Sequence, residues 1–175
     1  MPDQVSEPVG SVTVGECAFC KDAVIERQLV LQYPYQNPDV YVIYSIRKGA
    51  EPGSRFLILP KRHTAMVYGL NSSEIHHIWV VRKALAKVIK ETHPGCEVID
   101  FTQDDPAVGQ SVPHSHEQVV AVDPKTVALT WTMMSLFYPT ENVSDEEMQR
   151  VRKKFGEILR LEIDGITEGR SEVTA

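Results

Sequence analysis

A long amphipathic segment between strand-like segments is the feature that most constrains the fold of this 175-residue chain. Apolar residues recur along it at the spacing of one helix face, which predicts a helix that ends near Glu91. The apolar stripe consists of Ile75, Ile78, Trp79, Leu85, Ala86 and Ile89. The run from Asn71 to Glu74 supplies N-cap residues, and His93-Pro94-Gly95 ends the helix.

Strand-like segments lie on both sides of this helix. Val40–Tyr44 and Arg55–Leu59 precede it and predict an antiparallel hairpin with a long turn between the strands. Two further strands are predicted after the helix, at Glu97–Thr102 and Ser115–Val122, and a polar loop joins them.

A second long helix is predicted at about residues 144–163, because Ser144 and Glu147 have the spacing of a capping box. Its apolar stripe consists of Met148, Val151, Phe155, Ile158 and Leu159. Strands combined with two long helices, without a regular β-α-β alternation, predict an α+β fold. Residues 1–14 carry Pro, Gly and Ser without periodicity and are predicted to form a flexible arm, which leaves residues 15–175 as a single domain.

Composition excludes several classes of partner. The formal net charge of -6 provides no basic field for polyanionic nucleic acid, although a small anionic substrate is compatible with it. No apolar run approaches the roughly 18 residues that span a bilayer, and the acidic N-terminus is unlike a signal peptide. Three cysteines are too few for a disulfide scaffold, so a reduced, cytoplasmic setting is expected.

Polar residues cluster at the start of the last predicted strand. Side chains alternate along a strand, so His114, His116 and Gln118 are predicted to share one face, where burial is costly unless the groups are used or paired. The preceding loop adds Gly109, which permits close backbone approach. It also adds Gln110 and Ser111, neutral donors suited to a phosphate. An alternative is two surface histidines on an edge strand, but the adjoining loop favours an active centre.

These motifs resemble the histidine triad (HIT) superfamily, whose motif is His-x-His-x-His after a Gly-Gln-x-Val-x segment. The resemblance runs through three stretches in order: Cys17-Ala18-Phe19-Cys20, Leu57 to His63 with Pro-Lys-x-His, and Gln103-Asp104 through Gly109 to His116. It covers about residues 15–123. The resemblance implies a HIT-like fold, an antiparallel sheet packed with two long helices, together with a nucleotide substrate and a homodimer.

One departure concerns Gln118, which stands where the third histidine of the motif is expected. The form His-x-His-x-Gln resembles the galactose-1-phosphate uridylyltransferase branch and the dinucleoside polyphosphate phosphorylases. The loop from Phe101 to Gln110 is more similar to the fragile-histidine-triad hydrolases, so the sequence combines features of both branches.

The resemblance implies that His116 attacks the α-phosphate and carries the nucleotidyl group. A neutral imidazole is a competent nucleophile near pH 7, because its reference pKa is about 6.5. An amide at Gln118 can hold a phosphoryl oxygen but cannot shuttle a proton. We therefore expect an intermediate that waits for phosphate or a sugar phosphate. Gln103, Gln110 and Ser111 are the expected phosphate contacts.

Two other functions remain open. One is a HIT-type hydrolase that acts on dinucleoside polyphosphates or nucleoside phosphoramidates. The other is a non-catalytic nucleotide-binding module, which the presence of His116, Gln110 and Ser111 disfavours.

A metal site is suggested by the Cys-x-x-Cys spacing of Cys17 and Cys20, which is typical of a zinc knuckle. The resemblance implies that His63 and His114 complete a structural zinc site. A redox pair or two buried thiols are the alternatives for the cysteines.

Overall fold

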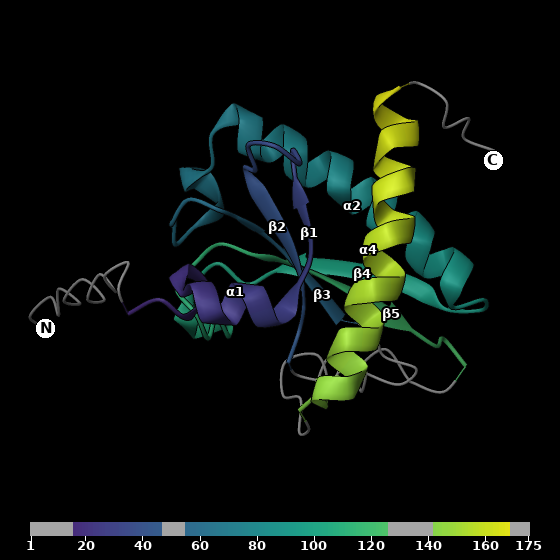
Figure 1. The fold of residues 1–175 in the computed structure, drawn as a ribbon. Helices are drawn as coiled ribbons and strands as arrows, with labels where there is room; N and C mark the ends of the chain where they lie inside the picture. The colour runs from purple at the N-terminus through teal and green to yellow at the C-terminus, as the bar shows by residue number, and fades with distance from the viewer. Residues whose placement is uncertain (1–15, 47–54, 126–141, 169–175) are drawn as a thin grey trace, which may run out of the picture.

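The computed structural model describes residues 16–46, 55–125 and 142–168, which form one antiparallel sheet and three α-helices (Figure 1). The strands are β1 (Leu29–Tyr33), β2 (Val40–Tyr44), β3 (Arg55–Pro60), β4 (Glu97–Thr102) and β5 (Glu117–Val122), in the spatial order β1-β2-β3-β5-β4. The helices are α1 (Asp22–Gln28), α2 (Ser72–Thr92) and α4 (Asp145–Thr167), and short 3-10 turns occur at η1 (Ala18–Cys20), η2 (Val67–Gly69) and η3 (Pro106–Val108). The predicted α+β fold is confirmed.

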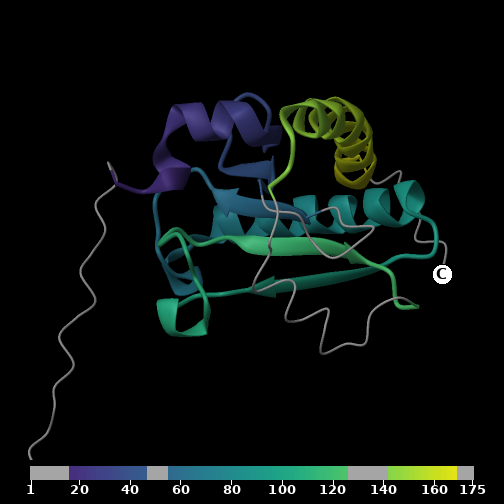
Figure 2. The same cartoon turned by 90° about the horizontal axis from the view of Figure 1, so that it is seen from below.

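Helices pack on both faces of the sheet. Phe56 and Ile58 of β3 face the main core, where Leu85 of α2 and Phe155 of α4 also lie. Because side chains alternate along a strand, Leu57 faces the other side and joins the smaller apolar cluster that includes Ile25 of α1. Figure 2 shows β5 and β4 side by side at the sheet edge away from α1 and α4.

Helix α2 begins where the sequence predicts, but it is rotated relative to the predicted stripe. Asn71 forms a capping box with Glu74, as its residue type favours. Ile75 and Trp79 were expected in the buried stripe, yet they are 44% and 60% exposed. The buried face is centred on other residues, Ile78, Val81, Ala84, Leu85, Val88 and Ile89. Glu74 also lies on this buried face, where it forms an ion pair with Arg62.

Helix α4 packs directly against the backbone of β1. A Cβ atom added at Gly156 would lie 2.8 Å from the carbonyl oxygen of Val30, so only glycine allows this approach. The guanidinium of Arg152 donates to the carbonyls of Leu29 (2.6 Å) and Arg27 (3.0 Å). Ser144 caps the helix, as the sequence predicts, and the helix continues to Thr167 rather than ending near residue 163.

Strand β5 begins at Glu117, two residues later than predicted. His114 and His116 therefore lie in the preceding loop, and the prediction that the strand begins at Ser115 is wrong. The backbone of this loop bonds elsewhere: the Ser115 N–H donates to the carbonyl of Thr64 at 2.6 Å. Ladder pairing starts only at Glu117, opposite both β3 and β4.

Several sequence predictions fall outside the described residues. They are the flexible arm at residues 1–14 and most of the turn between β2 and β3. In the part of the chain that the structure describes, no helix combines the length and apolarity that crossing a bilayer requires.

Candidate active site and metal centre

Three loops meet at one end of β3 and β5, because these neighbouring strands are antiparallel. The loop after Pro60 carries His63, and the loop before Glu117 carries His114 and His116. The η1 turn brings Cys17 and Cys20 to the same place, although these cysteines lie more than ninety residues from His114 in sequence. The residues predicted for the metal and for catalysis are therefore adjacent.

Cys17, Cys20, His63 and His114 form a cluster whose ligand atoms all lie within 4.8 Å of one another. The Sγ–Nδ1 distances are 3.5 Å for Cys17–His114, 3.6 Å for Cys20–His114 and 3.3 Å for Cys20–His63. A tetrahedral ion with bonds of about 2.3 Å to sulfur and 2.0 Å to nitrogen would separate such atoms by about 3.6 Å. The donor set and its spacing fit a four-coordinate metal ion.

The orientation and neutral state of the His114 ring also favour a cation. The Nε2 of His114 lies 2.8 Å from the carbonyl oxygen of Pro60 and donates to it, which leaves the Nδ1 lone pair facing the sulfurs. Burial lowers the pKa of His114 to about 4, so the ring is neutral. Burial, reinforced by Cys17, raises the pKa of Cys20 to about 11, so the Cys20 thiol stays protonated until a metal displaces the proton.

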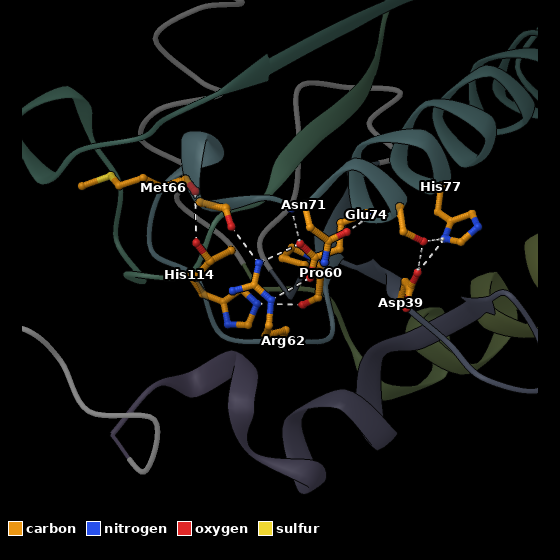
Figure 3. Close-up of polar contacts among 11 residues, drawn as sticks. Asp39, Pro60, Arg62, Met66, Asn71, Glu74, His77 and His114 are labelled. Atoms are coloured by element: carbon orange, nitrogen blue, oxygen red, sulfur yellow. Dashed lines mark hydrogen bonds and ion pairs between the residues drawn. The ribbon is translucent and has the colours of Figure 1, made fainter.

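The loop that carries His63 is anchored to the start of α2. Arg62 donates to Glu74 through Nε (3.0 Å) and Nη2 (2.8 Å), and Glu74 accepts from the backbone of Asn71 at 2.8 Å (Figure 3). Glu74 is buried, so its charge is compensated by this pairing. The helix cap thus holds the backbone next to His63.

His116 is 6% exposed and has one ring nitrogen committed. Its Nδ1 lies 2.7 Å from the carbonyl oxygen of His114 and donates to it, so the Nε2 atom keeps its lone pair. Burial lowers the pKa of His116, and the nearby charge of Arg55 acts in the same direction. The ring of Phe19 packs edge-on against His116 at a centroid distance of 5.3 Å. His116 is therefore a neutral imidazole with a defined tautomer.

Gln118 is 1% exposed and has partners on both sides of its amide. Its Oε1 accepts from Nη2 of Arg55, and its Nε2 donates to Oε1 of Gln103 at 2.6 Å. Gln103 in turn donates to the carbonyl of Val108 at 2.8 Å. Neutral amides and one cation thus form a continuous network beside His116.

The other residues expected to contact phosphate lie in the loop between β4 and β5. Gln110 is buried and donates to the carbonyl of Ala65 at 2.8 Å, which joins this loop to the one that carries His63. Ser111 is exposed. Gly109 has φ 96°, a backbone conformation that favours glycine, as its role in the loop predicts. A phosphate contact for Gln103, Gln110 or Ser111 stays a prediction.

Glu117 points to the opposite side of β5, where it meets other ionisable groups. Nε of Arg82 lies 2.8 Å from its carboxylate, and Arg82 also pairs with Asp100. Burial raises the pKa of Glu117 to about 7; the charge of Arg82 opposes this rise, and the neighbouring Asp100 carboxyl adds to it. An acidic residue behind the strand is thereby accommodated by an arginine from α2.

Sequence reasoning missed two residues at the site, Arg55 and Phe19. Arg55 opens an otherwise apolar strand, and a lone cation in that position was the available signal. Phe19 stands between the two cysteines, and no pattern in the sequence marks it as a neighbour of His116. Arg55 contacts Gln118 and Phe19 contacts His116, and both pairs are far apart in sequence.

Comparison with known proteins gives a family match. The HIT domain family model matches residues 27–125, which include His63, His114 and His116. A comparison with curated proteins found no match.

Solved structures share the fold at low sequence identity. The NitFhit protein of C. elegans is 18% identical (TM-score 0.58), over 75% of this chain but only 27% of that protein. A zinc-bound histidine triad family protein from Mycobacterium smegmatis is 19% identical (TM-score 0.56), over 90% of this chain and 99% of the other. A Plasmodium falciparum diadenosine triphosphate hydrolase is 15% identical (TM-score 0.54), over 83% and 80%. At these identities the similarity establishes the fold alone.

Proposed function

The chain belongs to the HIT domain family, and from this premise we propose that it is a nucleotidyltransferase or phosphorylase acting on nucleoside di- or polyphosphate compounds. The observation that carries the proposal is the state of His116. Its Nδ1–H is held by the carbonyl of His114, so the Nε2 lone pair of a neutral ring is available to a phosphorus atom.

The proposed reaction has two displacements at the α-phosphorus. In the first, Nε2 of His116 forms a bond to phosphorus while the bond to the leaving phosphate oxygen breaks. In the second, an oxygen of the acceptor forms the new bond, and Nε2 leaves with its electron pair as neutral imidazole. Gln103, Gln110 and Ser111 are proposed to hold the phosphate oxygens by neutral hydrogen bonds.

The identity of Gln118 favours transfer over hydrolysis. Water must lose a proton as it attacks, and an amide cannot accept that proton at neutral pH. An anionic phosphate acceptor has no such requirement at its attacking oxygen. The second candidate function is hydrolysis, the activity of the Plasmodium falciparum diadenosine triphosphate hydrolase whose fold is similar.

We propose that the four-residue cluster holds zinc in a structural role. Two thiolates from Cys17 and Cys20 and two neutral imidazoles from His63 and His114 would close a tetrahedral site without an open position. The ion would fix the N-terminal turn against the histidine loop. The zinc-bound relative from Mycobacterium smegmatis supports the choice of metal.

The test is mass spectrometry of the protein after brief incubation with a panel of nucleotides, with and without inorganic phosphate. We expect an adduct on His116 that phosphate discharges faster than water does. Equal discharge by water would support the hydrolase instead. Binding without any adduct or turnover would support the non-catalytic module.

We also propose a homodimer, formed across β4 and the exposed side of α2. Within the described ranges, no strand pairs with the outer edge of β4, and Trp79 is 60% exposed beside it. Light scattering at micromolar concentration checks this. A monomeric mass would contradict it, and Trp79→Glu should shift a dimer toward monomer.

A further inference from the structure

The side chain of Arg55 is a buried cation that the reaction described above does not use. Arg55 is 8% exposed and opens β3, on the sheet face that also carries Gln118. In the antiparallel register Leu57 pairs with Gln118 and Arg55 pairs with Val120, so the two side chains are diagonal neighbours. Burying a guanidinium is costly unless it makes specific contacts.

Three consecutive hydrogen bonds lead from Arg55 through Gln118 and Gln103 to Val108, and in each the donor is on the Arg55 side. A guanidinium only donates, so the oxygen of the Gln118 amide must face it. The nitrogen of Gln118 then faces Oε1 of Gln103. At the other end the carbonyl of Val108 only accepts, so the nitrogen of Gln103 must face it. Turning either amide over would place donor against donor. Arg55 at one end of this series of hydrogen bonds and the Val108 carbonyl at the other therefore fix the orientation of both amides.

We propose that Arg55 is a positioning residue that commits the intermediate on His116 to a phosphate acceptor, because it holds the Gln118 oxygen toward itself and leaves the second N–H of the Gln118 amide to meet a phosphoryl oxygen. This inference rests on the proposed function. The second N–H of the Gln118 amide can hold a phosphoryl oxygen, while its carbonyl oxygen is turned to the cation.

The proton requirements of the two acceptors explain the effect. When hydrogen phosphate attacks, an oxygen that is already anionic bonds to phosphorus and Nε2 of His116 leaves with its electron pair. When water attacks, the same bonds form and break, but a proton must also be taken up by a group or by solvent. A free Gln118 oxygen could accept a hydrogen bond from that water and orient it. Arg55 keeps this oxygen turned toward its own guanidinium, and the charge of Arg55 near His116 attracts the anionic acceptor.

The experiment measures how one intermediate divides between two acceptors. Diadenosine tetraphosphate is the probe: attack by His116 releases ATP, after which phosphate yields ADP and water yields AMP. The AMP-to-ADP ratio does not depend on the fraction of active enzyme. We expect Arg55→Met to raise it at least about tenfold, as for loss of a hydrogen bond to a charged group. Arg55→Lys, which keeps a cationic donor, should restore most of the wild-type ratio.

Arg82→Met is the matched control, because Arg82 is a part-buried arginine in ion pairs on the other face of β5. It should leave the ratio unchanged. If Arg55 acts through Gln118, adding Arg55→Met to Gln118→Met should change the ratio no further. Additive effects in this cycle would overturn the positioning role.

A second readout does not need turnover. The side-chain amide of Gln118 should give a slowly exchanging pair of NMR signals in the wild type and should lose this protection in Arg55→Met. A folded Arg55→Met with an unchanged product ratio or an unchanged amide overturns the inference while the His116 adduct still forms. Absence of that adduct in the wild type refutes the proposed function itself, and with it the role of Arg55 in choosing an acceptor.

Discussion

His114 and His116 lie two residues apart in one loop, are both buried, and use opposite ring nitrogens. His114 donates through Nε2 to Pro60 and directs Nδ1 to the sulfurs of Cys17 and Cys20. His116 donates through Nδ1 to the carbonyl of His114 and keeps Nε2 free for chemistry.

A backbone carbonyl therefore decides what each imidazole can do. Burial lowers the pKa of both rings, so charge does not distinguish them. The nitrogen that is left over after one hydrogen bond determines whether the ring is suited to hold a metal or to attack phosphorus. Substitutions on the two sides of the loop should therefore have different effects.

Substitution of the proposed nucleophile should separate catalysis from structure. His116→Asn should lower turnover by at least roughly a thousandfold, because the nucleophilic nitrogen is lost. Zinc content and melting temperature should stay close to the wild type. Exposed His76, changed to Asn, is the control and should keep full activity. Substantial turnover by His116→Asn in nucleotide assays would remove His116 from the mechanism.

Loss of a metal ligand should have the opposite pattern, with stability affected first. Cys17→Ser should lower the free energy of unfolding by about 4 kcal/mol, if free zinc is about a thousand times its Kd in the wild type. That corresponds to roughly 8–16 °C in Tm for a chain of this size. Elemental analysis and calorimetry measure both effects. Cys96→Ser removes another buried free cysteine outside the cluster, and it should retain the metal.

Glu117, which directly follows His116 and pairs with Arg82, should influence stability in a pH-dependent way. Its pKa is raised from 4.5 to about 7, so the folded state holds a proton that the unfolded state releases. This contribution is present below about pH 4.5 and is lost as pH rises toward 7. Glu117→Gln lacks it, so its stability should fall less between about pH 5 and about pH 8 than that of the wild type.

Urea unfolding of both proteins at each pH gives the difference directly. Effects of pH on metal ligands are common to both and cancel in this comparison. Parallel pH dependence in the two proteins would show that Glu117 ionises normally.

The smallest effect is expected at the helix cap that supports the metal side. Asn71→Ala should cost about 1 kcal/mol of unfolding free energy, the usual value for a lost N-cap. Activity should not change, because the cap reaches His63 through Glu74 and Arg62 but has no contact with His116. Asn71→Ser, which keeps a capping oxygen, should recover most of the stability. A drop in turnover for Asn71→Ala would contradict this expectation and show that the helix cap affects His116.

Much of the fold follows from local pattern. The bounds of β2 and β4 agree with the prediction, and both long helices begin at their capping residues. Helix α1 and strand β1 were not predicted, because α1 has only seven residues and passes directly into a strand of five. Too little periodicity accumulates over such lengths to indicate either element.

The candidate site divides in the same way. The residues that we propose for the metal and for the nucleophile were named from motifs, and they lie close together in the structure. Arg55 could not be assigned from its own neighbourhood, since its partner Gln118 is 63 residues away. The start of β5 was misplaced because the bond from Ser115 to Thr64, a long-range contact, replaces a ladder bond there.

The contact at Gly156 has a practical consequence for anyone shortening this protein. The family match ends at residue 125, yet the apolar face of α4 fills the same core as the sheet, and glycine brings the helix onto the backbone of Val30. A chain cut at residue 125 would open that core to water and should aggregate. Useful boundaries for expression are therefore set by α4, well beyond the recognisable motif.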